Sequence, residues 1–226
     1  FLSLIRRRIA GEPLQYILGR WEFMGLPFEV GEGVLIPRPE TELLPETAKV
    51  RLSNVKEPVV FDLCSGSGCI AISVAKQFPK AKVYAVEKSK EACEYLKKNI
   101  KLNKVKNVEL ICGDIADKSL LGGVESDCIL SNPPYIKSEE IPFLQKEVQK
   151  EPKTALDGGA DGLDFYKILA AVWLPRLKAD GFIAVECGES QAEDVSQLFY
   201  LAGGSVDTIN DLSGIPRVVT AVKRIG

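Results

Sequence analysis

The chain has 226 residues, of which 46% are hydrophobic and 27% charged, and its formal net charge is −2. These values are typical of a globular protein with one large α/β domain and a small appendage, and they exclude two full-size domains. No apolar run is long enough to span a membrane, and the near-neutral total argues against a dedicated nucleic-acid binder. The sequence also has no histidine, which removes the commonest metal ligand and general base.

Residues 1–54 form a first region. The sequence predicts a short basic helix over residues 2–10 and two β-rich runs over residues 14–25 and 26–36. These runs are joined around Met24-Gly25 as a hairpin. A helix with an acidic first turn follows, and Pro39 is placed to open it. The chain begins at Phe1 and not at Met, so we expect it to be a fragment.

Residues 55–226 form a second region in which strands and helices alternate. Strands are predicted over residues 59–63, 82–87, 108–114, 127–132 and 181–187, and helices over residues 69–78, 89–103, 163–177 and 190–203. Two final strands, over residues 205–210 and 217–223, are suited to antiparallel pairing. The pattern predicts an α/β fold with a doubly wound, mostly parallel, seven-stranded sheet and an antiparallel C-terminal strand.

Six cysteines form no C-x-x-C pair, and most lie in apolar runs or on predicted helix faces. We therefore expect reduced, buried thiols, as in a cytosolic protein. They are Cys64, Cys69, Cys93, Cys112, Cys128 and Cys187.

A glycine loop, "DLCSGSG", joins the first strand of the second region to the following helix. Gly66 and Gly68 allow a ligand to approach the backbone closely, and Glu87 ends the next strand, where a carboxylate meets the hydroxyls of a ribose. The spacing also fits the dinucleotide fingerprint, so the loop alone does not separate a nicotinamide cofactor from another nucleoside.

Two aspartates refine this prediction. Asp62 lies just before the loop, where it would repel a pyrophosphate but orient the ammonium group of a bound amino-acid moiety. Asp114 ends the third strand and is suited to accept a hydrogen bond from an adenine amino group, although a helix-capping or turn role is the alternative.

The tetrapeptide "NPPY" begins with Asn132, the last residue of the fourth predicted strand. Prolines fix their own φ and restrict the residue before them, so this segment is rigid before any ligand binds. The Asn132 side-chain oxygen and the Pro133 carbonyl form two acceptors beside the flat ring of Tyr135. This arrangement predicts a clamp for a planar –NH2 group, which it would orient and make more nucleophilic without prior deprotonation.

In their order, "DLCSGSG", Glu87, Asp114 and "NPPY" resemble the class I S-adenosylmethionine-dependent methyltransferases. The closer resemblance is to the HemK/PrmC family, the N5-glutamine methyltransferases that modify the Gly-Gly-Gln motif of peptide chain release factors. It extends from about Ile9 to the C-terminus and includes "GEPLQYILGRWEFMGLPFEV", "VLIPRPETELL", "DGGADGLDFYKIL", "VECGESQ" and "DLSGIPRVV".

The resemblance implies a Rossmann-like methyltransferase domain and assigns roles to individual residues. The implied cofactor, S-adenosyl-L-methionine, would contact Asp62, Cys64, Ser65, Gly66, Ser67, Gly68, Glu87, Asp114, Ile115 and Asn132. The glutamine pocket would consist of Asn132, Pro133, Pro134 and Tyr135, and Arg38 and Glu40 would help to close the site. We expect Asn132, Pro133 and Tyr135 to carry the catalysis.

The same resemblance implies a monomer that needs no metal and has a release factor as its protein substrate. It implies no membrane contact and no direct nucleic-acid binding, and it places the protein in the cytoplasm or in an organelle with its own translation. Family members usually carry a helical domain of several dozen residues before "GEPLQYILG", so residues 1–54 would be the remnant of that domain together with the hairpin and the connecting helix. The chain also departs from the family pattern at three single positions. The family usually has glycine and threonine where Cys64 and Ser65 stand, and often aspartate where Glu87 stands.

Three alternatives remain open. The same clamp suits an exocyclic amine of a DNA or RNA base, namely adenine N6 or guanine N2, with "RRR" at residues 6–8 and the lysine-rich segment 88–106 as candidate contacts. A nicotinamide dehydrogenase would use the glycine loop but leave "NPPY" unexplained. A scaffold that binds the cofactor without methyl transfer is the third.

Overall fold

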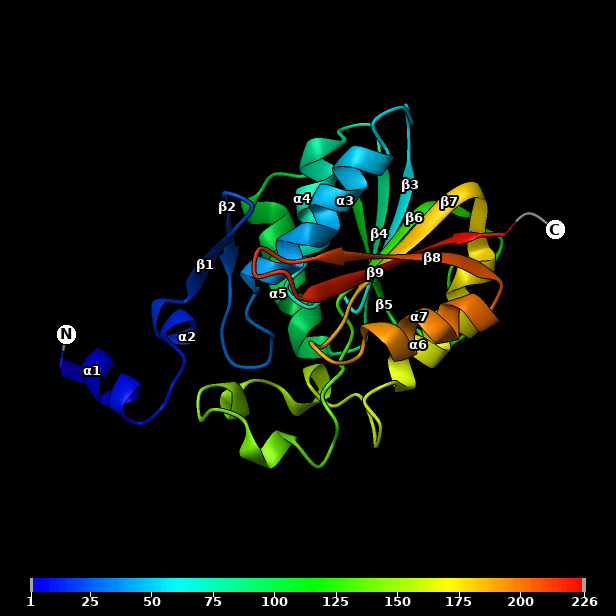
Figure 1. Cartoon of the computed structure of the whole chain (residues 1–226). Helices are drawn as coiled ribbons and strands as arrows, with labels where there is room; N and C mark the ends of the chain where they lie inside the picture. Colours follow the sequence, from blue (N-terminus) through cyan, green and yellow to red (C-terminus); the bar gives the residue numbers. More distant parts are fainter. Residues whose placement is uncertain (1, 225–226) are drawn as a thin grey trace.

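The computed structural model describes residues 2–224 of the chain. Its large sheet comprises β3 (Val59–Leu63), β4 (Lys82–Glu87), β5 (Val108–Cys112), β6 (Ser126–Ser131), β7 (Leu177–Glu186), β8 (Gly204–Asn210) and β9 (Pro216–Lys223). The strand order is β5-β4-β3-β6-β7-β9-β8, and β9 runs antiparallel to both of its neighbours while the other pairs are parallel (Figure 1). The predicted doubly wound, mostly parallel sheet is confirmed.

Helices cover both faces of this sheet. The α-helices are α1 (Leu2–Ile9), α2 (Leu14–Leu18), α3 (Leu43–Arg51), α4 (Cys69–Gln77), α5 (Lys90–Leu102), α6 (Asp164–Ile168) and α7 (Ala192–Leu201). The chain also forms the 3-10 helices η1 (Pro39–Glu42), η2 (Ile141–Phe143), η3 (Val148–Lys150), η4 (Lys153–Ala155) and η6 (Leu174–Arg176), and the π-helix η5 (Leu169–Trp173). None of the helices within residues 2–224 has the length and apolar character needed to cross a membrane.

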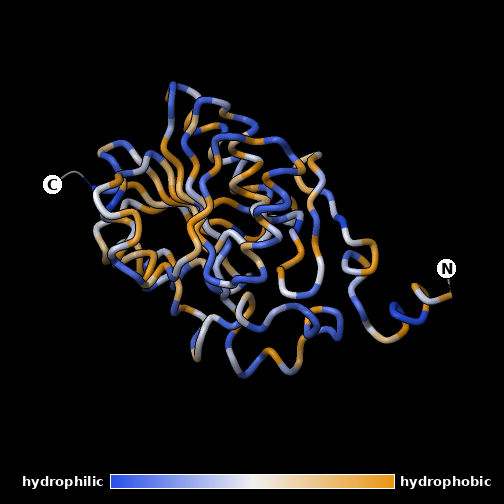
Figure 2. Tube along the Cα trace, turned by 180° about the vertical axis from the view of Figure 1, so that it is seen from behind, coloured by the Kyte–Doolittle hydropathy of each residue, from blue (hydrophilic) through white to orange (hydrophobic). Residues whose placement is uncertain are grey.

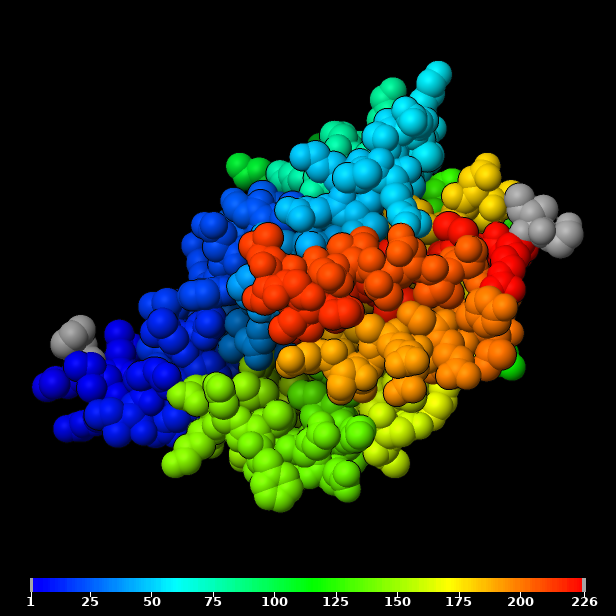
Figure 3. All heavy atoms as spheres, in the orientation of Figure 1, coloured from blue at the N-terminus to red at the C-terminus, as the bar shows by residue number. Residues whose placement is uncertain are grey.

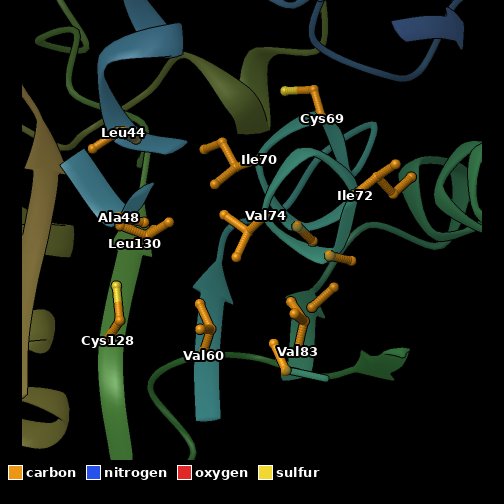
Figure 4. Packing of buried hydrophobic residues seen from close by; sticks show 14 of the residues in the cluster. Leu44, Ala48, Val60, Cys69, Ile70, Ile72, Val74, Val83, Cys128 and Leu130 are labelled. Atoms are coloured by element: carbon orange, nitrogen blue, oxygen red, sulfur yellow. The ribbon is translucent and has the colours of Figure 1, made fainter. Parts of the chain in front are cut away.

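Alternate residues of each strand point to opposite faces and build two cores. Val60 packs with α3 and α4 in one core, whereas its neighbour Phe61 packs with Tyr166 and Trp173 in the other. Figure 4 shows the first core, where side chains of α3 and α4 meet those of β3, β4 and β6. The strands therefore form the continuous apolar centre of the molecule (Figure 2).

The predicted β-rich run over residues 14–25 is wrong in its first half. Residues 14–18 form α2, which starts after Pro13 and ends at Gly19 with a φ of 73°. Proline before the first turn and a left-handed glycine after the last one favour a short helix over a strand. The hairpin itself, with β1 (Arg20–Phe23) and β2 (Leu26–Glu29), is confirmed around Met24 and Gly25.

The helix predicted over residues 163–177 is also interrupted, because the chain widens into η5 and then tightens into η6. Pro175 has no N–H to continue an α-helical ladder. Trp173 is fully buried at this point and donates from Nε1 to the Ile115 carbonyl at 2.9 Å. The irregular part of the helix therefore contacts Ile115, which is predicted to approach the cofactor.

Among the cysteines, Cys112 is exposed, so the prediction of a buried thiol is wrong there. It occupies the last position of β5, where its Sγ lies 2.8 Å from Sγ of the buried Cys93 on α5. All six cysteines are free thiols, as expected.

The N-terminal residues are not packed as a separate body. Phe23, Phe28 and Leu44 belong to the same core cluster as the sheet. Only α1 and the segment that follows it extend away at one end, beside residues 137–157 (Figure 3), where Arg8 pairs with Glu147 at 2.7 Å. The division of the chain near residue 54 remains a prediction.

Candidate active site

A cavity of about 620 Å³ opens at the carboxyl ends of β3, β4, β5 and β6, the edge at which doubly wound sheets bind ligands. A second cavity of about 180 Å³ adjoins it, since Leu35, Asn132 and Ala155 line both. Of the residues predicted for the site, the large cavity is lined by Cys64, Gly66, Glu87, Asp114, Ile115, Asn132 and Pro134. The small cavity is lined by Arg38, Asn132, Pro133 and Tyr135.

The other predicted residues line neither cavity: Asp62, Ser65, Ser67, Gly68 and Glu40. Four of these lie in or beneath the glycine loop and hold its shape. Ser65 donates from Oγ to the Asp62 carbonyl at 2.7 Å, and the Ser67 carbonyl accepts from Asn99 Nδ2 at 2.9 Å. A Cβ on Gly68 would lie 2.8 Å from Leu96 Cγ, so only glycine lets α4 begin this close to α5.

Asp62 is fully buried under the loop. Its Oδ2 accepts from the Ala71 backbone N–H at 3.0 Å and so ties β3 to α4, whereas Oδ1 has no hydrogen-bond partner among the described residues. Burial raises the pKa of Asp62 from 3.8 to about 7. The structure thus places a carboxyl group with one free oxygen immediately behind the loop rather than on the cavity wall.

Glu87 is on the cavity wall and braces two loops. Its Oε2 accepts from the Gly66 N–H at 2.8 Å, and its Oε1 accepts from the Ser89 N–H at 2.7 Å. Burial raises its pKa, and the two backbone donors oppose that shift. The carboxylate is therefore fixed in place with lone pairs left to accept hydrogen bonds from a ligand.

Asp114 and Ile115 form the opposite wall. Asp114 accepts from the Ala116 N–H at 2.9 Å and pairs with Lys88 Nζ at 2.7 Å, and the lysine holds the Asp114 pKa below its usual value. Ile115 is buried and gives this wall an apolar surface. A carboxylate beside an aliphatic side chain suits a flat ring that carries an amino group.

The small cavity is lined by residues that carry acceptor oxygens and by an aromatic side chain. Pro133 and Asn132 contribute the acceptors, and Tyr135 is largely buried, which raises the pKa of its phenol. The Tyr135 carbonyl is held by Gln191 Nε2 at 2.9 Å. Gly158 packs so closely that a Cβ there would lie 2.7 Å from the Tyr135 Cα. The rigid tetrapeptide is thus fixed from both sides.

The Asn132 side chain belongs to a buried hydrogen-bond chain. Its Nδ2 donates to Thr41 Oγ1 at 3.0 Å, and Thr41 Oγ1 donates to Glu186 Oε2 at 2.6 Å. Thr41 and Glu186 are each 2% exposed. Burial raises the Glu186 pKa from 4.5 to about 7. The amide oxygen of Asn132 is the end of the side chain that this network leaves free.

Arg38 and Glu40 are placed differently. Arg38 lines the small cavity and forms an ion pair with the buried Glu151, whose other oxygen accepts from the Ile36 N–H at 3.0 Å. Glu40 is exposed on η1 and lines neither cavity. Burial raises the Tyr135 pKa, and the charge of Glu40 adds to that rise. Its predicted part in closing the site remains a prediction.

Comparisons with known proteins point in one direction. A family model, the methyltransferase small domain, matches residues 40–160. The release factor glutamine methyltransferase of Thermodesulfovibrio yellowstonii is 41% identical over 228 residues, which cover 98% of this chain and 80% of that protein. The release factor-specific protein-(glutamine-N5) methyltransferase of Alicyclobacillus acidocaldarius is 31% identical, with a TM-score of 0.54 over 88% of this chain and 100% of that one.

The chain belongs to the release factor glutamine methyltransferase family. The sequence resemblance and the methyltransferase class are therefore confirmed. The Rossmann-like fold is confirmed by a wider set of structures, among them the 16S rRNA methyltransferase RsmC of T. thermophilus, which has a TM-score of 0.67 over 91% of this chain and 50% of that one. At 21% identity this last likeness shows the fold alone.

Cys64 is where the chain departs most visibly from the family pattern. Its φ is 61°, in the left-handed region that favours glycine, which is the residue that the sequence resemblance implies there. The side chain is packed against the apolar core on the α6 and α7 face of the sheet, and burial raises the thiol pKa well above its ordinary value.

Three residues of the candidate site were not predicted from the sequence: Thr41, Glu186 and Glu151. Glu186 ends a parallel strand at the ligand-binding edge, and that position alone was a usable signal. Thr41 and Glu151 gave no comparable signal, because their partners lie 145 and 113 residues away along the chain. Within residues 2–224, no group of three or more cysteines, aspartates or glutamates is arranged to hold a metal ion.

Proposed function

We propose that this protein transfers a methyl group to the side-chain amide nitrogen, N5, of the glutamine in the Gly-Gly-Gln motif of a peptide chain release factor. The observation that carries the proposal is the position of Asn132, which lines both cavities at the point where they adjoin. A residue there contacts a cofactor in the large cavity and an amide in the small one. Family membership supplies the substrate class.

S-adenosyl-L-methionine fits the large cavity. The cavity volume of about 620 Å³ is in the range of small-molecule sites. The fixed Glu87 carboxylate offers lone pairs to two ribose hydroxyls. Asp114 and Ile115 would hold the adenine, and Cys64 and Gly66 would line the methionine portion. The free Oδ1 of Asp62 would attract the ammonium group from behind the loop. When bound, this cofactor supplies a methyl group on a positively charged sulfur, and that sulfur would keep the electron pair of the broken S–C bond and leave as the neutral thioether of S-adenosyl-L-homocysteine.

The protein's own part in the reaction is to hold the amide. Asn132 Oδ1 and the Pro133 carbonyl would accept the two N–H groups, and Tyr135 would cover the flat face of the amide. Both acceptors favour a pyramidal nitrogen whose lone pair faces the large cavity, so catalysis rests on positioning and electrostatics. The nitrogen loses its extra proton after transfer, and no histidine is required.

We further propose that the protein acts as a metal-independent monomer where translation termination takes place, in the cytoplasm or in an organelle. Residues 1–54 would form the substrate-facing part. Arg38 and Leu35 from that part line the small cavity, which supports its proposed contact with the substrate.

The direct test is mass spectrometry of a purified release factor after incubation with the protein and S-adenosyl-L-methionine. We expect one added methyl group on the Gly-Gly-Gln peptide with wild type, and none with Asn132→Ala. The matched control is Asn54→Ala, which removes an exposed asparagine from a loop away from the site and should methylate normally. Cofactor binding by calorimetry without methylation would contradict the proposed substrate.

The alternative activity is methylation of a nucleic-acid base. Adding an oligonucleotide to the same assay distinguishes it from methylation of the release factor. The candidate basic contacts are partly neutralised in the structure. Arg7 pairs with Glu12, Arg8 with Glu147 at 2.7 Å, and Lys97 with Glu94 at 2.7 Å. We therefore expect no methyl transfer to DNA or RNA.

A further inference from the structure

Three side chains from distant parts of the sequence form one continuous hydrogen-bond chain behind the small cavity. Asn132 follows β6, Glu186 is the last residue of the neighbouring strand β7, and Thr41 lies on η1. The Asn132 Nδ2 to Thr41 Oγ1 distance is 3.0 Å, and the Thr41 Oγ1 to Glu186 Oε2 distance is 2.6 Å. Of the three, Asn132 and Glu186 are on the cavity wall, and Thr41 lies behind them.

The direction of each bond follows from the chemistry of the groups. An ionised carboxylate only accepts, so the single Thr41 hydroxyl proton is committed to Glu186. The Thr41 oxygen can then only accept, and it accepts from the –NH2 end of Asn132. A reversed Asn132 amide would place its oxygen against the Thr41 oxygen, with no proton between them. The carboxylate charge therefore selects one orientation of the amide.

Burial makes this selection strong. Thr41 and Glu186 are each 2% exposed, and a polar group left unpaired in such a place has lost its hydrogen bonds to water without a replacement. The two strands that carry Asn132 and Glu186 are hydrogen-bonded in register, Ser131 opposite Val185, so the spacing of the chain is set by the sheet.

We propose that Thr41 and Glu186 are positioning residues for methyl transfer, which orient the Asn132 amide so that its oxygen faces the substrate nitrogen. The inference rests on the proposed function, in which Asn132 Oδ1 accepts a hydrogen bond from the glutamine amide. Neither residue needs to touch the methyl group. Their effect passes through Asn132.

The network is sensitive to pH. Burial raises the Glu186 pKa to about 7, Arg217 on β9 and Arg38 oppose this shift, and Glu40 adds to it. Tyr135 after β6, Tyr166 on α6, Cys69 on α4 and the adjacent Cys187 also face Glu186. A protonated Glu186 carries its own proton and can donate to Thr41, which frees the Thr41 proton for Asn132 Oδ1. Below about pH 7 the amide orientation is then no longer unique.

The kinetic test compares two Thr41 variants. Thr41→Val keeps the shape of the side chain and removes the hydroxyl, so kcat should fall about tenfold or more while KM for the release factor changes less than about twofold. Thr41→Ser keeps the hydroxyl and should retain kcat within about threefold of wild type. The control is Thr220→Val, an equally buried threonine on β9 that lines neither cavity, and it should match wild type.

The dependence of kcat on pH is a second measurement, which would not change if Thr41 and Glu186 only stabilised the fold. In wild type, kcat should fall as the pH drops through about 7, whereas Glu186→Gln should have a lower kcat with no inflection in that range. The proposal is overturned if Thr41→Val keeps full kcat, if Thr41→Ser is as impaired as Thr41→Val, or if Glu186→Gln retains the inflection.

A measurement without turnover separates this proposal from the proposed function. The side-chain NH2 signals of Asn132 in a 15N-correlated NMR spectrum, identified by their loss in Asn132→Ala, should shift with an inflection near pH 7 in wild type. Thr41→Val should abolish that inflection. If wild type fails to methylate a release factor but shows the inflection, the substrate is wrong and the network stands. If wild type methylates but Thr41→Val leaves the Asn132 NH2 signals unchanged, the network is wrong.

Discussion

Cys64 combines a strained backbone with a well-packed side chain. A residue with a Cβ pays about 1–2 kcal/mol in the left-handed region, where glycine does not. We expect Cys64→Gly to be more stable than Cys64→Ala by about 1 kcal/mol, because alanine loses the packed sulfur but keeps the strain. Urea denaturation of the two variants tests this order, which reverses the usual preference for alanine over glycine.

The control for this comparison is Cys128, which is buried in the middle of β6. There the φ is not in the left-handed region, so Cys128→Ala should be more stable than Cys128→Gly. If alanine is the more stable replacement at Cys64 as well, the backbone strain assigned to that position is wrong.

Glu87 offers a test of the cofactor site at the same scale. Hydrogen bonds to a charged group contribute about 1.5–3 kcal/mol, so Glu87→Ala should weaken S-adenosyl-L-methionine binding by roughly 10- to 100-fold. Glu87→Asp should keep most of the affinity, since a carboxylate remains. Calorimetry measures both, with the exposed Glu109→Ala on β5 as control. Equal affinity in wild type and Glu87→Ala would remove Glu87 from the site.

At the scale of elements, Glu151 joins the irregular segment 137–157 to the residues that lead into η1. It is 5% exposed, pairs with Arg38 and accepts from the Ile36 N–H at 3.0 Å. In Glu151→Ala, the buried Ile36 N–H loses its partner, which costs about 1–3 kcal/mol. We expect hydrogen exchange at Ile36 to accelerate about tenfold or more, and trypsin to cut faster at Lys146 and Lys150.

The matched control is Glu147→Ala, four residues earlier in the same segment. Glu147 forms an exposed pair with Arg8, and such pairs contribute about 0–1 kcal/mol. Exchange at Ile36 should be unchanged in this variant. Equal acceleration in both variants would mean that the segment is held by something other than Glu151.

At the scale of the whole molecule, the sequence predicted what depends on local pattern. The helix predicted over residues 89–103 is α5, and Ser89 caps it by accepting from the Ala92 N–H at 3.2 Å. Alternating strands and helices also sufficed for the sheet. The helix α2 was missed because a five-residue run is too short for its periodicity to separate helix from strand.

The site was predictable only where one segment carries the chemistry. "NPPY" and Glu87 are examples, since their place at a strand end follows from the order of elements. The chain through Thr41 was not, because it is assembled from residues 41, 132 and 186, which only the folded sheet brings together. The position of Asp62 behind the loop, and not on the cavity wall, was also not predictable, because it depends on the direction of its side chain.

Two buried carboxyl groups give the molecule an unusual dependence of stability on pH. The pKa values of Asp62 and Glu186 are raised from 3.8 and 4.5, respectively, to about 7 for both. The folded state thus binds protons more tightly than the unfolded state, so stability is greatest below the ordinary values and is lost as pH rises through about 7. Carboxyl groups with lowered pKa values, such as Asp114 and Asp211, change the stability only at lower pH, where they become protonated.

We therefore expect the protein without cofactor to be more stable at about pH 5.5 than at about pH 8, by an amount on the order of 1 kcal/mol or more. Asp62→Asn replaces the carboxyl by a neutral group of the same shape, so it should be less sensitive to pH and more stable than wild type at the higher pH. Urea denaturation at both pH values measures this, with the exposed Glu109→Gln as control. Stability that rises with pH over this range, or an unchanged slope in Asp62→Asn, would show that Asp62 is ionised in the folded protein and paired with a group that compensates its charge.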